Sequence, residues 1–271
     1  MSFPLLSQQD SVSTSEKDLP ETIASALETT SWFLLTNFCP DLSGEALNDA
    51  YLSLCAKVGV PIGHDRQGTL IWDIKSRDAN KGPNAVVTYS EHNHEADLHT
   101  DSQYSSYPED YFTLLSLKRA SCGGGESSLL SLEDILAEMQ ETSAGREALS
   151  VLSSTDYPFI IPNVFRKNKQ EGVEINFGPV FNNGQIRFRI DTMEKALAHD
   201  PSLCTERQLN SFNFLKNLVR NTTRTHRFFL NDRDLIFINN KTMLHGRGSF
   251  TDSERHLLRI RMNKASYYES H

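Results

Sequence analysis

Two stretches of the sequence, far apart along the chain, carry side chains that could bind one divalent metal ion. His99 and Asp101 are separated by a single residue, so an extended strand would place both side chains on the same face. The best candidate for a third ligand is His245, in the segment 239–247. Two histidines and one carboxylate on one face of an octahedron leave three positions open, which is typical of non-haem iron(II) oxygenases. A chain with nine histidines contains about one His-x-Asp/Glu by chance, so the hypothesis depends on the motifs around it.

A second group of histidines offers an alternative pair of ligands. His92 and His94 could face one side of a strand, and His94 could bind a metal together with His99, but this arrangement leaves the C-terminal motif unused. We expect His94 to lie on a loop that leads to the metal-binding strand, near the mouth of a cavity, where it could contact substrate. Tyr104 and Trp72 could line the same cavity, although a tryptophan more often packs in a core.

The C-terminal segment 255–262 alternates between two kinds of face. Arg255, Arg259 and Arg261 share one face with Leu257, whereas the other face is mostly apolar. On a strand at the surface these arginines would lie in solvent. Inside a barrel they would face a cavity and bind carboxylates through paired hydrogen bonds. A metal with open positions beside an arginine in a cavity suits a dicarboxylate co-substrate.

A glycine run at 123–125 is followed by Glu126 and Ser127. It either forms a turn between two strands or allows the backbone to approach a ligand, to which Ser127 would donate its hydroxyl. The strand–Gly-x-Gly-x-x-Gly–helix arrangement is missing from the sequence pattern, so we do not expect a dinucleotide site.

The overall composition is that of a globular protein with a substantial core, with 38% hydrophobic and 23% charged residues among 271. The net charge of −8 differs from the basic footprint of proteins that bind nucleic acid or anionic membranes. Four scattered cysteines without a Cys-x-x-Cys pair indicate reduced thiols rather than a zinc ribbon or a disulfide framework. The sequence has neither a signal-peptide pattern nor an apolar run of about 18 residues. We therefore expect a cytoplasmic protein that binds neither nucleic acid nor membrane.

Short strand-like segments, punctuated by Gly, Pro, Asn or Asp, dominate the rest of the pattern. They predict one domain over residues 1–271, with a double-stranded β-helix (jelly-roll) core, helical decoration and a polar arm or loop at about 7–18. We expect strands at 31–38, 69–74, 85–90, 111–117, 128–130, 157–161, 173–177, 185–190, 225–230, 235–239 and 255–262, and helices at 21–28, 43–58, 132–139, 144–152 and 206–220.

In their order and spacing, four motifs closely resemble the TauD/TfdA (clavaminate synthase-like) family of iron(II)- and 2-oxoglutarate-dependent oxygenases. The resemblance spans about residues 30–263. The motifs are His99-Thr100-Asp101, Gly124-Gly125-Glu126-Ser127, Leu244-His245-Gly246-Arg247 and the tail Arg255-x-x-x-Arg259.

The resemblance implies a role for each matching position. His99, Asp101 and His245 would be the iron ligands. Arg255 would pair with the distal carboxylate of 2-oxoglutarate, with Ser127 supporting that contact. The co-substrates would be 2-oxoglutarate and O2, and succinate would be released as a substrate C–H bond is oxidised.

The resemblance also implies substrate contacts and a reaction type. Arg259 would meet an acidic group of the substrate, and Arg189 and Asp191 belong to a segment, 185–191, that resembles a family segment near the substrate. Related halogenases carry a small residue where this chain has Asp101. The resemblance therefore implies hydroxylation, or a desaturation, epoxidation or cyclisation variant, rather than halogenation.

The expected substrate is a small zwitterionic or anionic molecule, with a free or carrier-bound amino acid, or a related intermediate of specialised metabolism, as the leading hypothesis. A sulfonate or an aryloxyacid is the alternative within the same chemistry. Zinc also accepts two imidazoles and a carboxylate, so a zinc hydrolase is a further alternative, although the His-Glu-x-x-His pattern is missing. A jelly-roll module that binds a ligand without catalysis is the non-enzymatic alternative. The sequence does not predict an oligomeric state.

Overall fold

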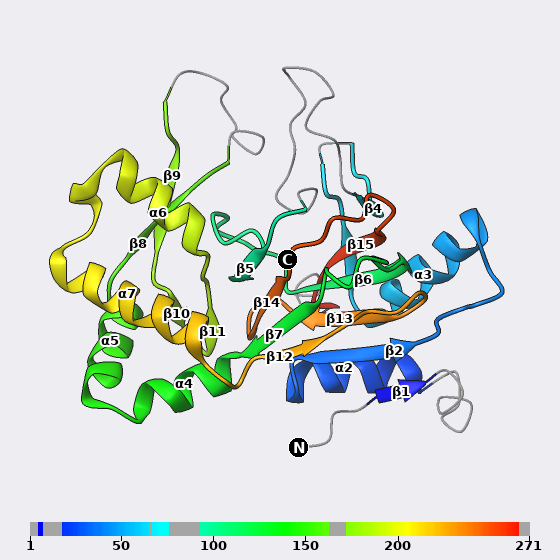
Figure 1. Ribbon diagram of the computed structural model, residues 1–271, viewed down its shortest axis with the longest axis horizontal. Helices are drawn as coiled ribbons and strands as arrows, with labels where there is room; N and C mark the ends of the chain where they lie inside the picture. The colour runs from blue at the N-terminus through cyan, green and yellow to red at the C-terminus, as the bar shows by residue number, and fades with distance from the viewer. Residues whose placement is uncertain (1–4, 8–17, 66, 76–92, 163–171, 266–271) are drawn as a thin grey trace.

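The computed structural model describes residues 5–7, 18–65, 67–75, 93–162 and 172–265, and it contains two mainly antiparallel β-sheets flanked by helices (Figure 1). The larger sheet runs in the order β1 (Leu5–Ser7), β2 (Trp32–Thr36), β13 (Leu235–Asn239), β6 (Tyr111–Lys118), β15 (His256–Asn263) and β3 (Val60–Ile62), and β4 (Trp72–Lys75) also pairs with β15. The smaller sheet runs in the order β12 (His226–Phe228), β7 (Ser127–Ser131), β14 (Met243–Arg247) and β5 (Ala96–His99).

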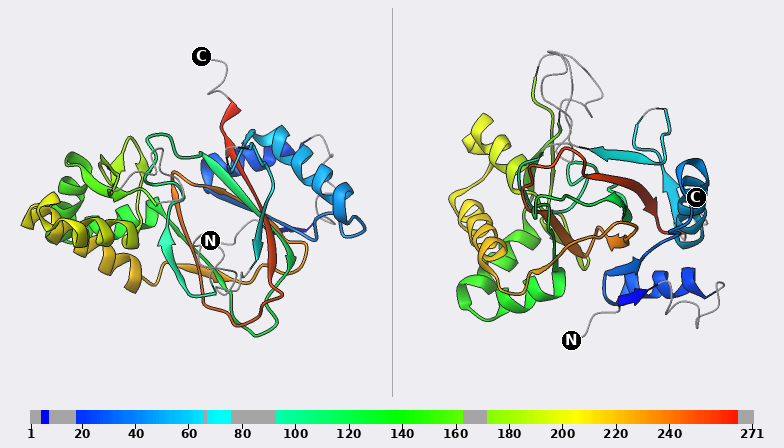
Figure 2. Two further views of the ribbon diagram at one scale, coloured as in Figure 1. Left: turned by 90° about the horizontal axis from the view of Figure 1, so that it is seen from above. Right: turned by 45° about the vertical axis from the view of Figure 1, so that its right-hand side comes forward.

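Helices cover the outer face of each sheet, on opposite sides of the molecule (Figure 2). The larger sheet packs against α2 (Leu19–Thr29) and α3 (Gly44–Val58), through a core that includes Ile23, Tyr51 and Leu258. The smaller sheet packs against a helical layer, through a core that includes Leu130 and Leu244. That layer consists of α4 (Leu132–Gln140), α5 (Ser143–Ser154), α6 (Ile190–His199), the short 3-10 helix η3 (Pro201–Leu203) and α7 (Glu206–Asn221), with the strand pairs β8 (Tyr157–Ile160)–β9 (Ile175–Gly178) and β10 (Phe181–Asn182)–β11 (Gln185–Ile186).

A third core lies between the two sheets, and strand alternation explains how it forms. In β13, Leu235 and Phe237 point to the outer core beside α2 and α3, whereas Ile236 and Ile238 point to the inner core. The inner core is completed from the smaller sheet by residues such as Leu129. A strand buried on both faces has to be apolar throughout, which is why 235–238 reads Leu-Ile-Phe-Ile. The predicted jelly-roll core with helical decoration is confirmed by these two facing sheets.

Most predicted elements of the described region agree with the structure, and one is wrong. The segment 185–190 was expected to be a strand, but β11 ends at Ile186 and α6 begins at Ile190. Between them, the backbone N–H of Phe188 donates to the hydroxyl of Thr100, 3.1 Å away, so the segment pairs with the end of β5 rather than with a sheet neighbour. The expected strand at 85–90 lies outside the described residues, as does the expected arm apart from its ends, Ser7 and Asp18.

Two global features complete the description. None of the helices in the described ranges combines the length and the apolar character that crossing a bilayer requires. The four cysteines, Cys39, Cys55, Cys122 and Cys204, are all free thiols, as the sequence predicted.

Candidate metal centre

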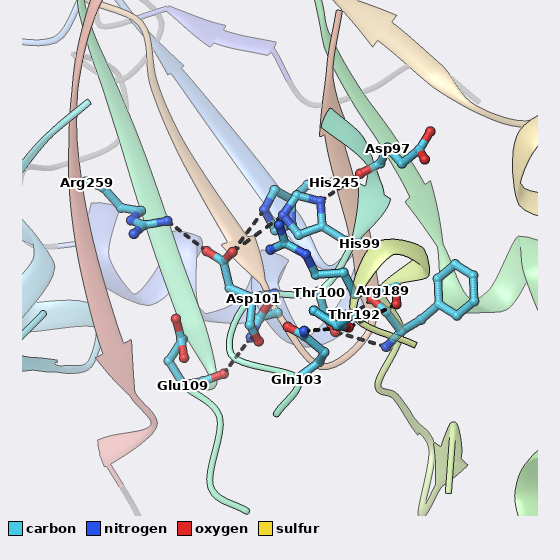
Figure 3. Close-up of polar contacts among 12 residues, drawn as sticks. Asp97, His99, Thr100, Asp101, Gln103, Glu109, Arg189, Thr192, His245 and Arg259 are labelled. Atoms are coloured by element: carbon cyan, nitrogen blue, oxygen red, sulfur yellow. Dashed lines mark hydrogen bonds and ion pairs between the residues drawn. The ribbon is translucent and has the colours of Figure 1, made fainter. Parts of the chain in front are cut away.

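The register between β5 and β14 brings the two predicted histidine ligands together. His99, the last residue of β5, lies directly opposite His245 in β14, and the centroids of the two rings are 4.3 Å apart. Asp101 follows β5 and turns its carboxylate toward both rings (Figure 3). Its Oδ1 lies 3.6 Å from Nε2 of His99 and 3.7 Å from Nε2 of His245, and the three side chains are only 11–14% exposed. One donor atom from each residue lies within 4.8 Å of the others.

These separations fit a shared metal ion better than direct hydrogen bonds. A nitrogen–oxygen distance of 3.6–3.7 Å is too long for a hydrogen bond. Two atoms that each lie about 2.1 Å from one ion can be up to about 4.2 Å apart. The tautomer of His99 fits as well, because its Nδ1 lies 2.7 Å from the carbonyl oxygen of Asp97 and must donate to it. Nε2 of His99 therefore presents a lone pair to the space beside Asp101.

Burial and neighbouring charges favour the protonation states that a metal needs. Burial lowers the pKa of His245 to about 3, and the nearby His99 and Arg259 act in the same direction, so its imidazole is neutral. Burial alone would raise the pKa of Asp101, but Arg259 and the two imidazoles outweigh burial and hold that pKa well below its usual range. The two imidazoles, with that of His245 neutral, and the ionised carboxylate of Asp101 make a donor set that fits a divalent ion.

Asp101 is placed by a turn rather than by strand periodicity. The sequence argument put His99 and Asp101 on one face of a strand, but β5 ends at His99 and Asp101 opens a turn. Asn240, only 1% exposed, holds that turn: its Oδ1 accepts from the backbone N–H of Asp101 at 2.7 Å, and its Nδ2 donates to the Asp101 carbonyl at 3.1 Å. The same Nδ2 donates to the carbonyl of Glu109 at 3.1 Å. Sequence reasoning assigned Asn240 no role, although it lies five residues before His245.

The arginines of β15 face the space between the sheets, which decides between the two interpretations of that segment. Nη1 of Arg259 donates to Oδ2 of Asp101 at 3.0 Å, so this guanidinium directly contacts a candidate metal ligand. Arg261, two residues further, lies 3.7 Å from the carboxylate of Glu109. Leu257, on the same face, packs in the inner core.

Arg255 lies just before β15, and its side chain is buried against the glycine run. It is 7% exposed, and its guanidinium carbon lies 5.0 Å from the ring centroid of Phe250, which Arg247 approaches to 4.9 Å. Burial, together with Arg247, lowers the pKa of Arg255 to about 9. Gly125 has a φ of +78°, and a Cβ there would stand 3.3 Å from Nε of Arg255. Among the described residues, no carboxylate pairs with Arg255, so its guanidinium suits an incoming anion.

The structure describes all four of the remaining residues that were predicted to contact substrate. Arg189 and Asp191 form an ion pair of 2.7 Å at the start of α6, and with His99 they line a small pocket. Tyr104 is half-buried, and burial raises its pKa. His94 is exposed, and its carbonyl accepts from Nη2 of Arg247 at 2.7 Å.

Ser127 begins β7 opposite Arg247 in the strand register. Within the described residues, no hydrogen bond joins its hydroxyl to Arg255. The predicted support of Arg255 by Ser127 therefore stays a prediction.

Comparisons with known proteins agree with this architecture. The sequence model of the family described as "Taurine catabolism dioxygenase TauD, TfdA family" matches residues 5–261. No curated protein matches the sequence. Among solved structures, an asparagine oxygenase in complex with Fe(II), 2S,3S-3-hydroxyasparagine and succinate has a TM-score of 0.69 at 15% identity, covering 92% of this chain and 79% of that chain.

Two further structures are similar in the same way. The non-haem iron oxygenase OrfP in complex with Fe and alpha-ketoglutaric acid has a TM-score of 0.67 at 16% identity, covering 94% of this chain and 82% of its own. PvcB from Pseudomonas aeruginosa has a TM-score of 0.61 at 14% identity, covering 90% of this chain and 79% of its own. At these identities the likeness establishes a shared fold.

Proposed function

The chain belongs to the TauD/TfdA family of iron(II)- and 2-oxoglutarate-dependent dioxygenases, and on that premise we propose that it hydroxylates a C–H bond of a small amino acid. Family membership confirms the predicted enzyme class and its predicted need for iron(II), 2-oxoglutarate and O2. The proposal is carried by one observation: two imidazoles and one carboxylate converge on one point, in a fold that also holds a buried arginine that no described carboxylate neutralises.

We assign the metal to His99, Asp101 and His245. Iron(II) bound there would supply the activation of O2 and the oxidation of a C–H bond, chemistry that no side chain performs. The protein holds the donor atoms ready: the Asp97 carbonyl orients the ring of His99, and Arg259 keeps Asp101 ionised. A divalent metal held by these three side chains would keep coordination positions open for the co-substrates.

We assign the distal carboxylate of 2-oxoglutarate to Arg255, with Ser127 as a supporting donor. The guanidinium is already desolvated and packed on Phe250, so little of its freedom is lost when an anion binds. Gly125 supports this placement, since a side chain there would crowd Nε of Arg255.

For the substrate, we propose contacts from Arg259, His94, Tyr104 and the Arg189–Asp191 pair. Arg259 would use the N–H groups that Asp101 leaves available, and its buried Nε has no hydrogen-bond partner within the described part of the chain. The asparagine oxygenase was solved with a hydroxylated amino acid, which supports an amino acid here over a sulfonate or an aryloxyacid. Desaturation, epoxidation and cyclisation are variants of the same chemistry, and an amino acid tethered to a carrier protein is a further form of the substrate. We also propose that residues 1–271 form one catalytic domain and that the enzyme works in the cytoplasm.

The test is an assay of succinate release from 2-oxoglutarate, coupled to O2 consumption, with iron(II) and a panel of L-amino acids. We expect release to require iron(II) and to increase with at least one amino acid, and His245→Ala to abolish both iron binding and release. Hydrolytic activity that depends on zinc, without succinate release in the presence of iron(II), would overturn the proposal in favour of a zinc hydrolase. Absence of iron binding and of any reaction would favour a binding module.

A further inference from the structure

A second buried acid lies close to the metal centre, and its hydrogen bonding is incomplete. The side chain of Glu109 is only 2% exposed, and the nearest cation, Nη1 of Arg261, is 3.7 Å from its Oε1. This distance is too long for a hydrogen bond, and Oε1 has no hydrogen-bond partner among the described residues. Arg261 is committed elsewhere, because its Nη2 donates to the carbonyl of Gly63 at 2.6 Å.

Glu109 is physically tied to the metal centre. Nδ2 of Asn240 reaches both the carbonyl of Asp101 and the carbonyl of Glu109, each at 3.1 Å. Arg261, the partner of Glu109, follows Arg259, the partner of Asp101, on the same face of β15. Figure 3 shows the side chain of Glu109 next to the Arg259–Asp101 pair.

The four side chains form two pairs of opposite charge that sum to zero. The negative charges belong to Asp101 and Glu109, and the positive charges belong to Arg259 and Arg261. A ligand that carries an ammonium as well as an acid can satisfy Glu109, which a simple anion cannot do. Such a ligand can place its acid beside the arginines and its ammonium beside Glu109.

A buried carboxylate without a donor is costly, and a closed ion pair would remove that cost. In a purely structural pair the nitrogen–oxygen distance is usually about 2.7–2.9 Å. Here no described residue donates to Oε1, and an ammonium group offers up to three N–H donors.

We propose that Glu109 accepts a hydrogen bond from the α-ammonium of the substrate and thereby selects amino acids over acids that lack an amino group. Arg261 would position the carboxylate of Glu109. The inference rests on the proposed function and narrows its substrate class to compounds with a free α-ammonium. N-acylated amino acids, aryloxyacids and other desamino acids are excluded by it.

The test uses the visible absorption band of the anaerobic enzyme–iron(II)–2-oxoglutarate complex, titrated with L-amino acids. Each amino acid that perturbs the band is compared with its N-acetyl derivative and with the acid that lacks the amino group. We expect the wild-type enzyme to bind the free amino acid about 10- to 100-fold more tightly than either analogue, as for one hydrogen bond between charged groups. Equal affinities, or a panel in which no amino acid responds, would overturn the inference.

Variants then locate the preference. Glu109→Gln keeps the shape and removes the charge, so it is expected to bring the ratio of affinities close to one without changing the affinity for 2-oxoglutarate. Glu109→Asp keeps the charge and is expected to keep part of the preference, which a merely structural role would not predict. Glu28→Gln is the matched control. This variant also loses the charge of a glutamate, but its ion pair of 2.7 Å with Lys264 lies on the outer side of the larger sheet.

The outcomes separate this inference from the proposed function. A complex whose band responds to amino acids, but whose preference is unchanged in Glu109→Gln, overturns only the inference. Equal preferences in Glu109→Asp and Glu109→Gln do the same. If the glutamine variant does not fold, an aspartate variant that keeps none of the preference overturns the inference. Failure of the band to form in the wild-type enzyme overturns both.

Discussion

Replacing Asn240 by alanine should weaken metal binding more than it weakens the fold. Asn240 is buried, and its side chain makes three hydrogen bonds, two to the peptide groups of Asp101 and one to the carbonyl of Glu109. Its neighbour Asn239 is also buried and makes two, accepting from the backbone N–H of Lys241 and donating to the carbonyl of Leu27. The two asparagines are therefore a matched pair in which only one holds a candidate metal ligand.

The expected magnitudes follow from these contacts. At about 1 kcal/mol for each net hydrogen bond, Asn240→Ala should lower the free energy of unfolding by about 3 kcal/mol and Asn239→Ala by about 2 kcal/mol. Loss of a residue that orients a metal ligand typically lowers metal affinity by about 10- to 100-fold. We expect that loss for Asn240→Ala, because the Asp101 turn would no longer be fixed, and no more than a twofold change for Asn239→Ala.

Two measurements check the prediction. Urea unfolding of the metal-free variants gives the two stabilities, and anaerobic titration with iron(II) gives the two affinities under conditions in which both variants are folded. Similar iron affinities in the two variants would refute the reasoning, since they would mean that the strand register alone positions Asp101.

Three further predictions concern Arg255, Asp252 and Cys122. Arg255→Ala should raise the 2-oxoglutarate concentration needed for half-maximal succinate release about a hundredfold or more, because it leaves the bound carboxylate buried without a partner; an unchanged requirement would move the anchor to another arginine. Hydrogen bonds from Ser121 lower the pKa of Asp252 to about 2, so its stabilising contribution is present above its unfolded pKa of about 3.9 and is lost as the pH falls toward 2. Asp252→Asn should reduce the pH dependence of the unfolding midpoint in that window, and an unaltered pH profile of the midpoint would contradict this. Hydrogen bonds from the backbone, first from Thr251, lower the pKa of the exposed Cys122 to about 7, whereas burial raises that of Cys55 to about 12; iodoacetamide should therefore label Cys122 first near neutral pH, and Cys122→Ser should remove the fast phase.

Local patterns predicted the elements whose signals are strong over many residues. The helical spacing after Ser43 and the apolar run at 235–239 correspond to α3 and β13. The segment 185–190 was mistaken for a strand because Gln-Ile-Arg-Phe-Arg-Ile alternates, while its real partners are tertiary. Phe188 bonds to Thr100 beside the metal centre, and α6 begins immediately after Arg189. Alternation over six residues could not reveal a contact with a residue far away in the chain.

For the glycine run at 123–125 too, the residue types predicted the local conformation, whereas packing decided which atoms it contacts. Its sequence predicted a turn or a close backbone approach, and both occur. The neighbours that require glycine are the segment 249–250 and the side chain of Arg255: a Cβ on Gly124 would collide with the carbonyl oxygen of Ser249. Which atoms lie opposite a glycine depends on packing, which residue type alone does not encode.

By itself, the sequence determined the chemistry that is available: which side chains can bind a metal, and which face of the last strand carries arginine. Those properties belong to residue types and to the two-residue period of a strand. The tertiary structure alone decided that His245 stands opposite His99, that Asn240 holds the Asp101 turn, and that Glu109 lies buried beside the centre. These are contacts between residues distant in the chain, and they arise from sheet register and from burial of whole strand faces, to which every residue of the core contributes.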